Sequence, residues 1–119
     1  MKFLMLIKHT ESYRSLSVPQ SLMDAMGEFV SANLKSGVLK DTAGLKPTSD
    51  GFRVRLSRGQ LGTTDGPFSE TKEIIGGYAL VEVPTRDDAL GVARQFMDLH
   101  RIHWREFEGE CEVRPLEEM

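Results

Sequence analysis

The most distinctive chemistry in this sequence lies in a short central segment, Asp-Gly-Pro-Phe at residues 65–68. An Asp ahead of Gly-Pro is typical of a tight turn, because its carboxylate accepts hydrogen bonds from nearby backbone N–H groups and Pro restricts the chain. In this interpretation Phe68 anchors the turn in the core. The alternative is a ligand cleft, in which Asp65 is an anchor or general base and Gly66 allows close approach of the backbone. The rim of that cleft would be lined by Glu70 and Lys72.

A second polar group follows the first apolar run of the chain. His9 is a candidate acid or base because an imidazole can both donate and accept a proton, and Arg14 can bind a carboxylate or phosphate through paired hydrogen bonds. Tyr13 lies beside Arg14 and is a further candidate for ligand contact. We expect the chain to leave the sheet here, so that a cleft between sheet and helices gathers His9, Asp65 and Tyr78.

Three further motifs match parts of known sites but lack the rest. Ser69-x-x-Lys72 matches one element of penicillin-recognising serine enzymes, yet the Ser-Asp-Asn and Lys-Thr-Gly elements are missing. His100 and His103 share a helix face only if the second helix reaches them, and no spacing fixes a third metal ligand. The glycines at positions 59, 62 and 66 are not followed by the Lys of a phosphate loop. The sequence therefore predicts neither a metal nor a cofactor.

Charge and composition narrow the expected partners. The formal net charge of −3 gives no general attraction to nucleic acid or to anionic membranes. A modest basic strip at residues 53–58 lacks interleaved aromatic residues, which is typical of a solvated face rather than a nucleic-acid platform. No apolar run approaches the roughly 20 residues of a membrane span. The single Cys111 excludes an internal disulfide, so we expect a cytoplasmic protein.

Apolar periodicity predicts the first two elements that position these residues. Residues 2–8 form a continuous apolar run, typical of a central strand that is buried on both faces. A helix follows, with Ser17 as N-cap, Gln20 completing a capping box and Gly37 as the C-terminal stop. Its predicted inward stripe consists of Leu22, Met26, Phe29, Val30 and Leu34.

The rest of the chain predicts further strands and a second helix. Strands are expected over residues 38–46, 52–57, 60–64, 74–83 and 110–116. The strand at 52–57 alternates apolar and polar residues, so we expect it to have one buried and one wet face. Thr85 and Asp88 form a capping box before a helix over residues 85–99, behind which Trp104 is expected to cap the core. The inner stripe of this helix is predicted to be Ala89, Ala93, Phe96, Met97 and His100.

This order of elements predicts an α+β, ferredoxin-like fold in a single domain over residues 1–119. Two βαβ-like halves, with a strand hairpin between them, place both helices on one face of an antiparallel sheet. The opposite face has no helix to cover it, although residues 4–6 and 79–81 are apolar in succession. Each such side chain left in water forfeits about 1.5–3 kcal/mol. A second copy of the same sheet is the simplest cover, which predicts a homodimer.

Nearly the whole chain resembles one protein family. The run Thr64-Asp65-Gly66-Pro67-Phe68-Ser69-Glu70-Thr71-Lys72-Glu73, followed by Gly76-Gly77-Tyr78, is similar to the signature of the DGPF subgroup of the YCII-related family. Residues 2–7 and 108–116 are also similar to that subgroup. The resemblance implies a ferredoxin-like fold within the dimeric α+β-barrel superfamily. Such proteins are often encoded beside extracytoplasmic-function sigma factors, which suggests a regulatory or stress context.

The same resemblance does not carry an enzymatic activity to this chain. Some YCII-type relatives are enzymes that use a His–Asp pair, with the His on the first helix and the Asp near the end of the first strand. Here the corresponding positions are Met26 and Lys8-His9, so neither half of the pair is present.

Three functions remain compatible with the sequence. The first is a module that binds or senses a small molecule in a cleft around Asp65. The second is a cofactor-free lyase, isomerase or monooxygenase with His9 or Asp65 as acid or base. The third is a protein-interaction partner in sigma-factor-linked regulation, which would carry an exposed apolar patch beyond the dimer contact. An enzyme requires a base within hydrogen-bond reach of an enclosed cavity, so the surroundings of His9 and Asp65 matter most.

Overall fold

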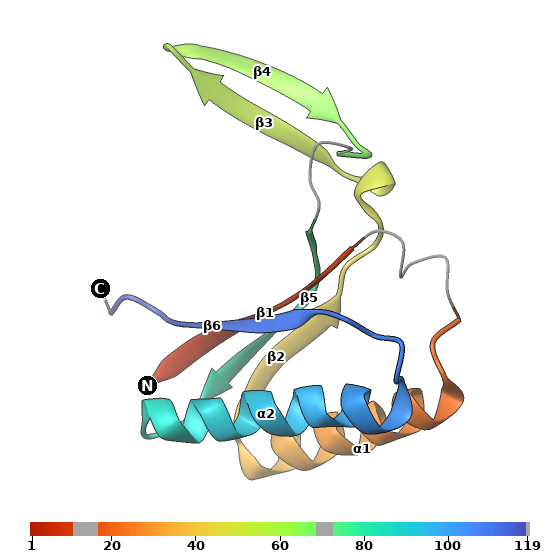
Figure 1. The fold of residues 1–119 in the computed structure, drawn as a ribbon. Coiled ribbons are helices and arrows are strands. Elements are labelled where there is room, and N and C mark those ends of the chain that lie inside the picture. Colours follow the sequence, from red (N-terminus) through yellow and green to blue (C-terminus); the bar gives the residue numbers. More distant parts are fainter. Residues whose placement is uncertain (11–16, 69–72, 119) are drawn as a thin grey trace.

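Two helices cover one face of a four-stranded antiparallel sheet in the computed structural model, which describes residues 1–10, 17–68 and 73–118 (Figure 1). The sheet has the strand order β2-β5-β1-β6, and all three neighbouring pairs are antiparallel. Its strands are β1 (Lys2–His9), β2 (Leu39–Gly44), β5 (Ile74–Glu82) and β6 (Glu110–Pro115). The helices are α1 (Gln20–Ser36) and α2 (Arg86–His103). This topology confirms the predicted α+β, ferredoxin-like fold.

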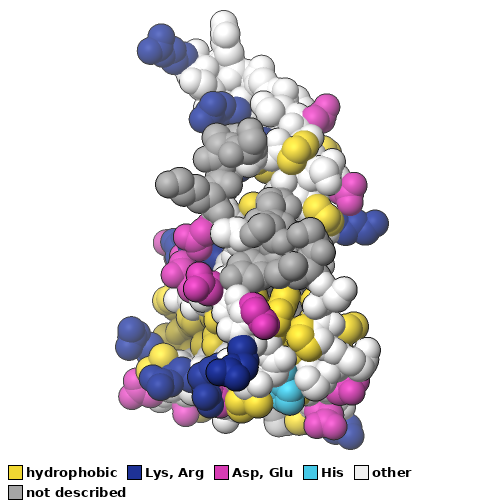
Figure 2. All heavy atoms as spheres, turned by 45° about the vertical axis from the view of Figure 1, so that its right-hand side comes forward, with side chains coloured by type: hydrophobic (Ala, Val, Ile, Leu, Met, Phe, Trp, Pro, Cys, Tyr) yellow, Lys and Arg dark blue, Asp and Glu magenta, His cyan; other side chains and the backbone are white. Residues whose placement is uncertain are grey.

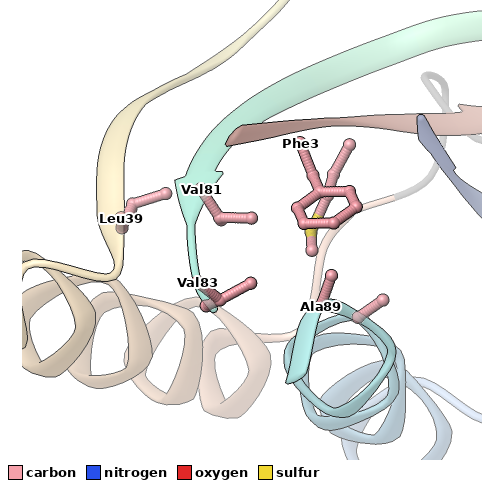
Figure 3. Packing of buried hydrophobic residues seen from close by; sticks show 7 residues of the cluster. Phe3, Leu39, Val81, Val83 and Ala89 are labelled. Atoms are coloured by element: carbon pink, nitrogen blue, oxygen red, sulfur yellow. The ribbon is translucent and has the colours of Figure 1, made fainter. Parts of the chain in front are cut away.

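Side chains along the two central strands alternate between the two faces of the sheet. One face is buried against the helices, and the other, here called the open face, has no helix over it. Phe3 and Met5 of β1 point toward the helices and are buried, and Val81 of β5 pairs with Phe3 on the same side. Leu4 and Leu6 alternate with them and are only half-buried, because no helix covers the other face of the sheet. Figure 3 shows the resulting core between sheet and helices, where Phe3 and Val81 meet Leu39, Val83 and Ala89.

The start of α1 differs from the prediction, whereas its end agrees. Pro19 rather than Ser17 occupies the N-cap, and no side-chain hydrogen bond caps the helix. Gln20 cannot complete the expected capping box because its side-chain amide donates to Asp24 instead, at 2.9 Å. Gly37 ends the helix in the left-handed conformation with φ 83°, as predicted. The inward stripe is correct except for Leu34, which is exposed at the last turn.

Helix α2 begins as predicted but continues one turn further. The Thr85 hydroxyl accepts the backbone N–H of Asp88 at 3.1 Å and thereby caps the first turn. The helix does not end at Leu99 but runs to His103, since no Gly or Pro lies between these two residues and Phe107, beyond the helix, packs onto His100 in its last turn. Trp104 is buried at this end, as expected for a residue that caps the core. Neither helix of the described chain has the length and apolar character needed to cross a membrane.

The remaining two strands form a separate hairpin that projects from the sheet (Figure 1). Strands β3 (Phe52–Ser57) and β4 (Gln60–Asp65) pair with each other only, after a short 3-10 turn, η2 (Thr48–Asp50). The prediction that β3 has one buried face is wrong for this chain. Every residue of both strands is exposed, because the hairpin extends past the edge of the sheet and no helix reaches it. The space-filling view shows basic side chains on this projecting part (Figure 2).

Candidate functional site

A cavity of about 660 Å³ lies between the sheet and the helices, beyond the packed core. It is bordered by the ends of β1 and α2, the first half of α1, and the adjoining parts of β2 and β5. Most of its wall is apolar or aromatic, and includes Leu22, Met26, Val30, Phe96 and Trp104. None of the described lining residues is a Lys, Arg, Asp or Glu. The described lining therefore favours uncharged groups, because a buried charge would have no counter-ion among these residues.

Small residues on the sheet create this cavity. Gly44 of β2 pairs with Gly77 of β5, and both border the cavity on the side of the helices. Further along the same strands, the equivalent positions hold Leu39 and Val81, which fill the core instead. Gly76 adds a third position without a side chain, at an irregularity in the pairing of β1 with β5. The sheet thus lacks a side chain at three of the positions that border the cavity.

His9 borders the cavity at the end of β1, and its ring occupies the space beside Gly76. A Cβ atom on Gly76 would collide with the His9 imidazole, since Nε2 lies in the space it would occupy. The other ring nitrogen, Nδ1, donates to the carbonyl oxygen of Thr10 at 2.9 Å, because a carbonyl can only accept. The ring also packs against Phe107 at 6.2 Å between centroids. His9 is therefore held in one orientation at the sheet side of the cavity.

His100 forms the helix side of the same cavity and is buried. Its Nδ1–H donates to the carbonyl oxygen of Phe96, one turn earlier, at 3.1 Å. The ring lies between those of Phe96 and Phe107, at centroid distances of 4.9 and 4.7 Å. Burial lowers the pKa of His100 below its usual 6.5, and the nearby His9 lowers it further, although the hydrogen bond to Phe96 opposes them. A neutral imidazole at neutral pH follows from this balance.

The aromatic wall around His100 was only partly predictable. Spacing on α2 correctly placed Phe96 and His100 on the inner stripe, and Trp104 next to the core. Phe107 was not singled out, although it contacts His9, His100 and Trp104 and closes this end of the cavity. It lies in the connection after α2, where no periodicity indicates which residues turn inward. Its distance of three residues from Trp104, and the ring contact at 5.4 Å, are evident only in the structure.

The Asp-Gly-Pro-Phe segment lies at the base of the projecting hairpin and not at the cavity. Asp65 is the last residue of β4, is exposed, and is not among the described residues that border the cavity. The N–H of Gly66 donates to the carbonyl oxygen of Gly51 at 2.9 Å. A side chain on Gly66 would collide with the backbone of Thr48, so the close approach that requires Gly here is made by the chain itself.

Phe68 does not anchor the turn in the core, contrary to the first interpretation of this segment. Its ring lies under the guanidinium group of Arg53 at 3.8 Å, on the hairpin, and it does not belong to the buried core cluster. Its N–H donates to Thr48 Oγ1 at 3.4 Å. The described contacts of the segment thus tie together η2, β3 and the end of β4.

The other predicted ligand contacts are distributed differently. Tyr78 borders the cavity, but its hydroxyl donates to Asp41 Oδ2 on β2 at 2.8 Å, and this bond raises the pKa of Tyr78. The structure thus brings His9 to the cavity, with His100 added, and leaves Asp65 outside it. Tyr78 borders the cavity from β5, but it pairs with Leu6, so its side chain lies on the open face of the sheet. Four predicted residues lie outside the described part of the chain: Tyr13, Arg14, Glu70 and Lys72.

Comparison with known proteins identifies the family of this chain. The sequence model of the YCII-related domain matches residues 1–96. The chain belongs to the YCII-related family. A protein of Rhizobium meliloti (strain 1021), described as uncharacterized, is 36% identical over 83 residues, which cover 70% of this chain and 63% of that protein. The matched part is therefore less than two thirds of that relative's length.

The resemblance placed the positions of a His–Asp pair at Met26 and at Lys8-His9, and of these Met26 and His9, but not Lys8, are among the described residues at the cavity. Met26 and His9 border it from opposite sides, one on α1 and one on β1. No group of three or more His, Cys, Asp or Glu residues that could hold a metal occurs in the described part of the chain. Among the described residues at the cavity, the side chains able to exchange a proton include the imidazoles of His9 and His100.

The open face of the sheet carries charges that are already paired. Lys8 Nζ lies 3.0 Å from Glu112 Oε1 and 3.3 Å from Glu110 Oε1, across the β1–β6 pair. The hydrogen bonds to Glu112 and Glu110 raise the pKa of Lys8, and the bond to Lys8 lowers the pKa of Glu112. This ion-paired cluster borders the half-buried Leu4 and Leu6 and leaves them as the apolar centre of that face.

Proposed function

We propose that this YCII-related protein binds a small, mostly apolar organic molecule in the cavity between its sheet and helices. The observation that carries the proposal is the cavity itself. Its volume of about 660 Å³ falls within the roughly 300–1,000 Å³ common for small-molecule sites. Its wall combines apolar and aromatic side chains with a few polar groups, the usual composition of such sites. The place of the site therefore differs from the Asp65 cleft that the sequence suggested.

A matched pair of glycine substitutions tests this proposal. Gly44 and Gly62 both lie in strands, and a Cβ atom at either position meets nothing within 4 Å. Gly44 borders the cavity and Gly62 lies in the hairpin, so Gly44→Phe fills the cavity while Gly62→Phe controls for the general cost of replacing a strand Gly. We expect para-ethylanisole, monitored by saturation-transfer NMR, to bind the wild type and the Gly62→Phe variant but not Gly44→Phe. Equal binding to all three proteins, or to none, would contradict the proposal.

A second candidate function is a cofactor-free reaction in the same cavity with His9 as acid or base. It is supported by the position of the His9 imidazole at the cavity, held by its hydrogen bond to Thr10. Asp65, the other acid or base considered from the sequence, has no such support because it does not border the cavity. Turnover of a bound molecule that is lost in His9→Asn while binding persists would distinguish this function from simple binding.

We further propose that the protein forms a homodimer and resides in the cytoplasm. The homodimer is supported by two uncovered apolar surfaces on one chain. One is the face of the hairpin with Val54, Leu56 and Leu61, which are 61%, 69% and 75% exposed, and the other is the open face of the sheet around Leu4 and Leu6. A two-fold axis lets each copy cover the other's apolar surfaces with the same contacts. A cytoplasmic location is supported by the single, half-buried Cys111.

A further inference from the structure

The tautomer of His100 is fixed by its hydrogen bond to the helix. A carbonyl oxygen can only accept, so the 3.1 Å contact between Nδ1 and the Phe96 oxygen places the proton on Nδ1. In the neutral imidazole the other nitrogen, Nε2, then carries a lone pair and acts as an acceptor. The two ring nitrogens of His100 thus differ: Nδ1 is hydrogen-bonded to the backbone of its own helix, whereas Nε2 can only accept a hydrogen bond.

The acceptor edge of His100 has no protein donor in the described part of the chain. Its recorded contacts are the bond to Phe96 and the ring contacts to Phe96 and Phe107, none of which reaches Nε2 with an N–H or O–H. The side chain is 7% exposed and borders the cavity, and it also borders a second, more polar pocket that includes Arg101, Arg105 and Glu108. A buried acceptor of this kind destabilises the fold unless something in the cavity supplies a donor.

The lack of charged side chains among the described lining residues of the cavity limits which chemical groups could act as that donor. No Lys, Arg, Asp or Glu is among these residues, and the hydroxyl groups of Tyr78 and Thr42 are already used as donors to Asp41 and to the backbone oxygen of Tyr78. A carboxylate or ammonium group would therefore be buried without a counter-ion among the described lining residues. A neutral hydroxyl group avoids this cost and supplies the donor that Nε2 lacks.

We infer that the cavity selects a neutral, ring-sized molecule of the phenol or enol class, whose hydroxyl group donates to His100 Nε2 while its ring packs among Phe96, Trp104 and Phe107. This inference rests on the proposed function and adds the substrate class. Phe96 and Phe107 contact the His100 ring, Trp104 contacts Phe107, and all four side chains border the cavity, so aromatic surface for a flat ring lies next to the imidazole.

A pair of probes that differ only in the donor tests the inference. Para-ethylphenol and its methyl ether, para-ethylanisole, share a ring and a side chain, and both are uncharged at neutral pH. We expect the wild type to bind the phenol about tenfold more tightly than the ether, the amount expected for one buried hydrogen bond. Both affinities are measured by ligand-observed NMR titration of the full chain.

Substitutions at His100 assign the preference to that residue. His100→Phe keeps a ring but removes the acceptor, so we expect it to bind phenol and ether equally. His100→Gln keeps an acceptor oxygen and should retain part of the preference, and it also serves if His100→Phe does not fold. His103→Gln is the control, because His103 lies on the same helix but does not border the cavity.

The outcomes separate the inference from the proposed function. If the wild type binds phenol and ether equally, or if His100→Phe keeps the preference, the inference is wrong while binding in the cavity stands. If neither probe binds the wild type, or if Gly44→Phe binds both as well as the wild type does, the proposed function is wrong and the inference with it.

Discussion

The molecule has two regions, the body, which consists of the four-stranded sheet with helices α1 and α2, and the projecting β3–β4 hairpin. Both contain apolar residues in strands, but these residues are buried in the body and exposed in the hairpin. Phe3 and Val81 in the central strands are 2% and 1% exposed, whereas Leu56 and Leu61 in the hairpin are 69% and 75% exposed. Both regions alternate or cluster Leu, Val and Phe in strands, and both have well-formed antiparallel pairs. The difference is that two helices lie over the body and none lies over the hairpin (Figure 1). The pattern of apolar residues therefore indicates which side chains would gain from burial, but it does not indicate which element buries them.

The hairpin is the region whose stability depends most on something outside it. A two-stranded ribbon is marginal in water, and its described contacts with the rest of the chain are made at its base, by Gly66 and Phe68. Its apolar face carries Val54, Leu56 and Leu61 into solvent. The proposed second copy would remove this difference, because it would give the hairpin a covered face like that of the body.

The largest predicted difference between the two regions is in the free energy of unfolding. Phe3→Ala removes a buried ring from the core and should destabilise the protein by about 3–5 kcal/mol. Leu56→Ala, measured by urea unfolding at sub-micromolar concentration, should change stability by less than about 0.5 kcal/mol, because Leu56 is exposed in the single chain. Equal losses would show that the hairpin is packed as tightly as the body.

The next effect concerns self-association. Leu56→Arg places a charge on the apolar face of the hairpin and should weaken the proposed homodimer at least about tenfold in sedimentation velocity. Leu90→Arg is the control, since Leu90 is 49% exposed on helix α2. A wild-type protein that sediments as one subunit at micromolar concentration would refute the homodimer.

A smaller effect distinguishes the two helix starts of the body. Thr85→Ala removes an observed cap hydrogen bond and should cost about 1 kcal/mol of unfolding free energy. Ser17→Ala should have almost no effect, because no side-chain hydrogen bond caps α1. Urea unfolding of both variants measures the difference. A loss in Ser17→Ala as large as that in Thr85→Ala would mean that α1 is capped after all.

The smallest predicted effect is a pH dependence of the unfolding free energy that comes from His100, on helix α2. The pKa of His100 is lowered in the folded protein, so the unfolded chain binds a proton more readily between that lowered value and about 6.5. The unfolding free energy should therefore fall as pH is lowered from about 6.5 through the folded pKa, and this contribution should be complete above 6.5. His100→Gln should show a shallower fall than His103→Gln in unfolding measured across this range. Identical pH profiles would exclude His100 as the source.

The sequence predicted the fold better than the site, for physical reasons. The Thr85 N-cap and the Gly37 stop are local signals, and each was confirmed in the structure. The cavity depends on non-local pairing, because Gly44 and Gly77 leave a gap only when β2 and β5 lie side by side. His9 was identified from its position after a strand, but the Asp65 segment was given a site because of its composition, although its described contacts are with the hairpin base. Phe107 and the tautomer of His100 could not be read from spacing.

The most direct test of where this protein binds its ligand is a backbone-amide NMR titration of the full chain with para-ethylphenol. We predict chemical-shift changes at the cavity, at Gly44, Gly77, Phe96, His100 and Trp104, and none along the hairpin at residues 52–65. Changes confined to the hairpin and the Asp65 segment, with the cavity unaffected, would contradict the proposal and restore the site that the sequence suggested.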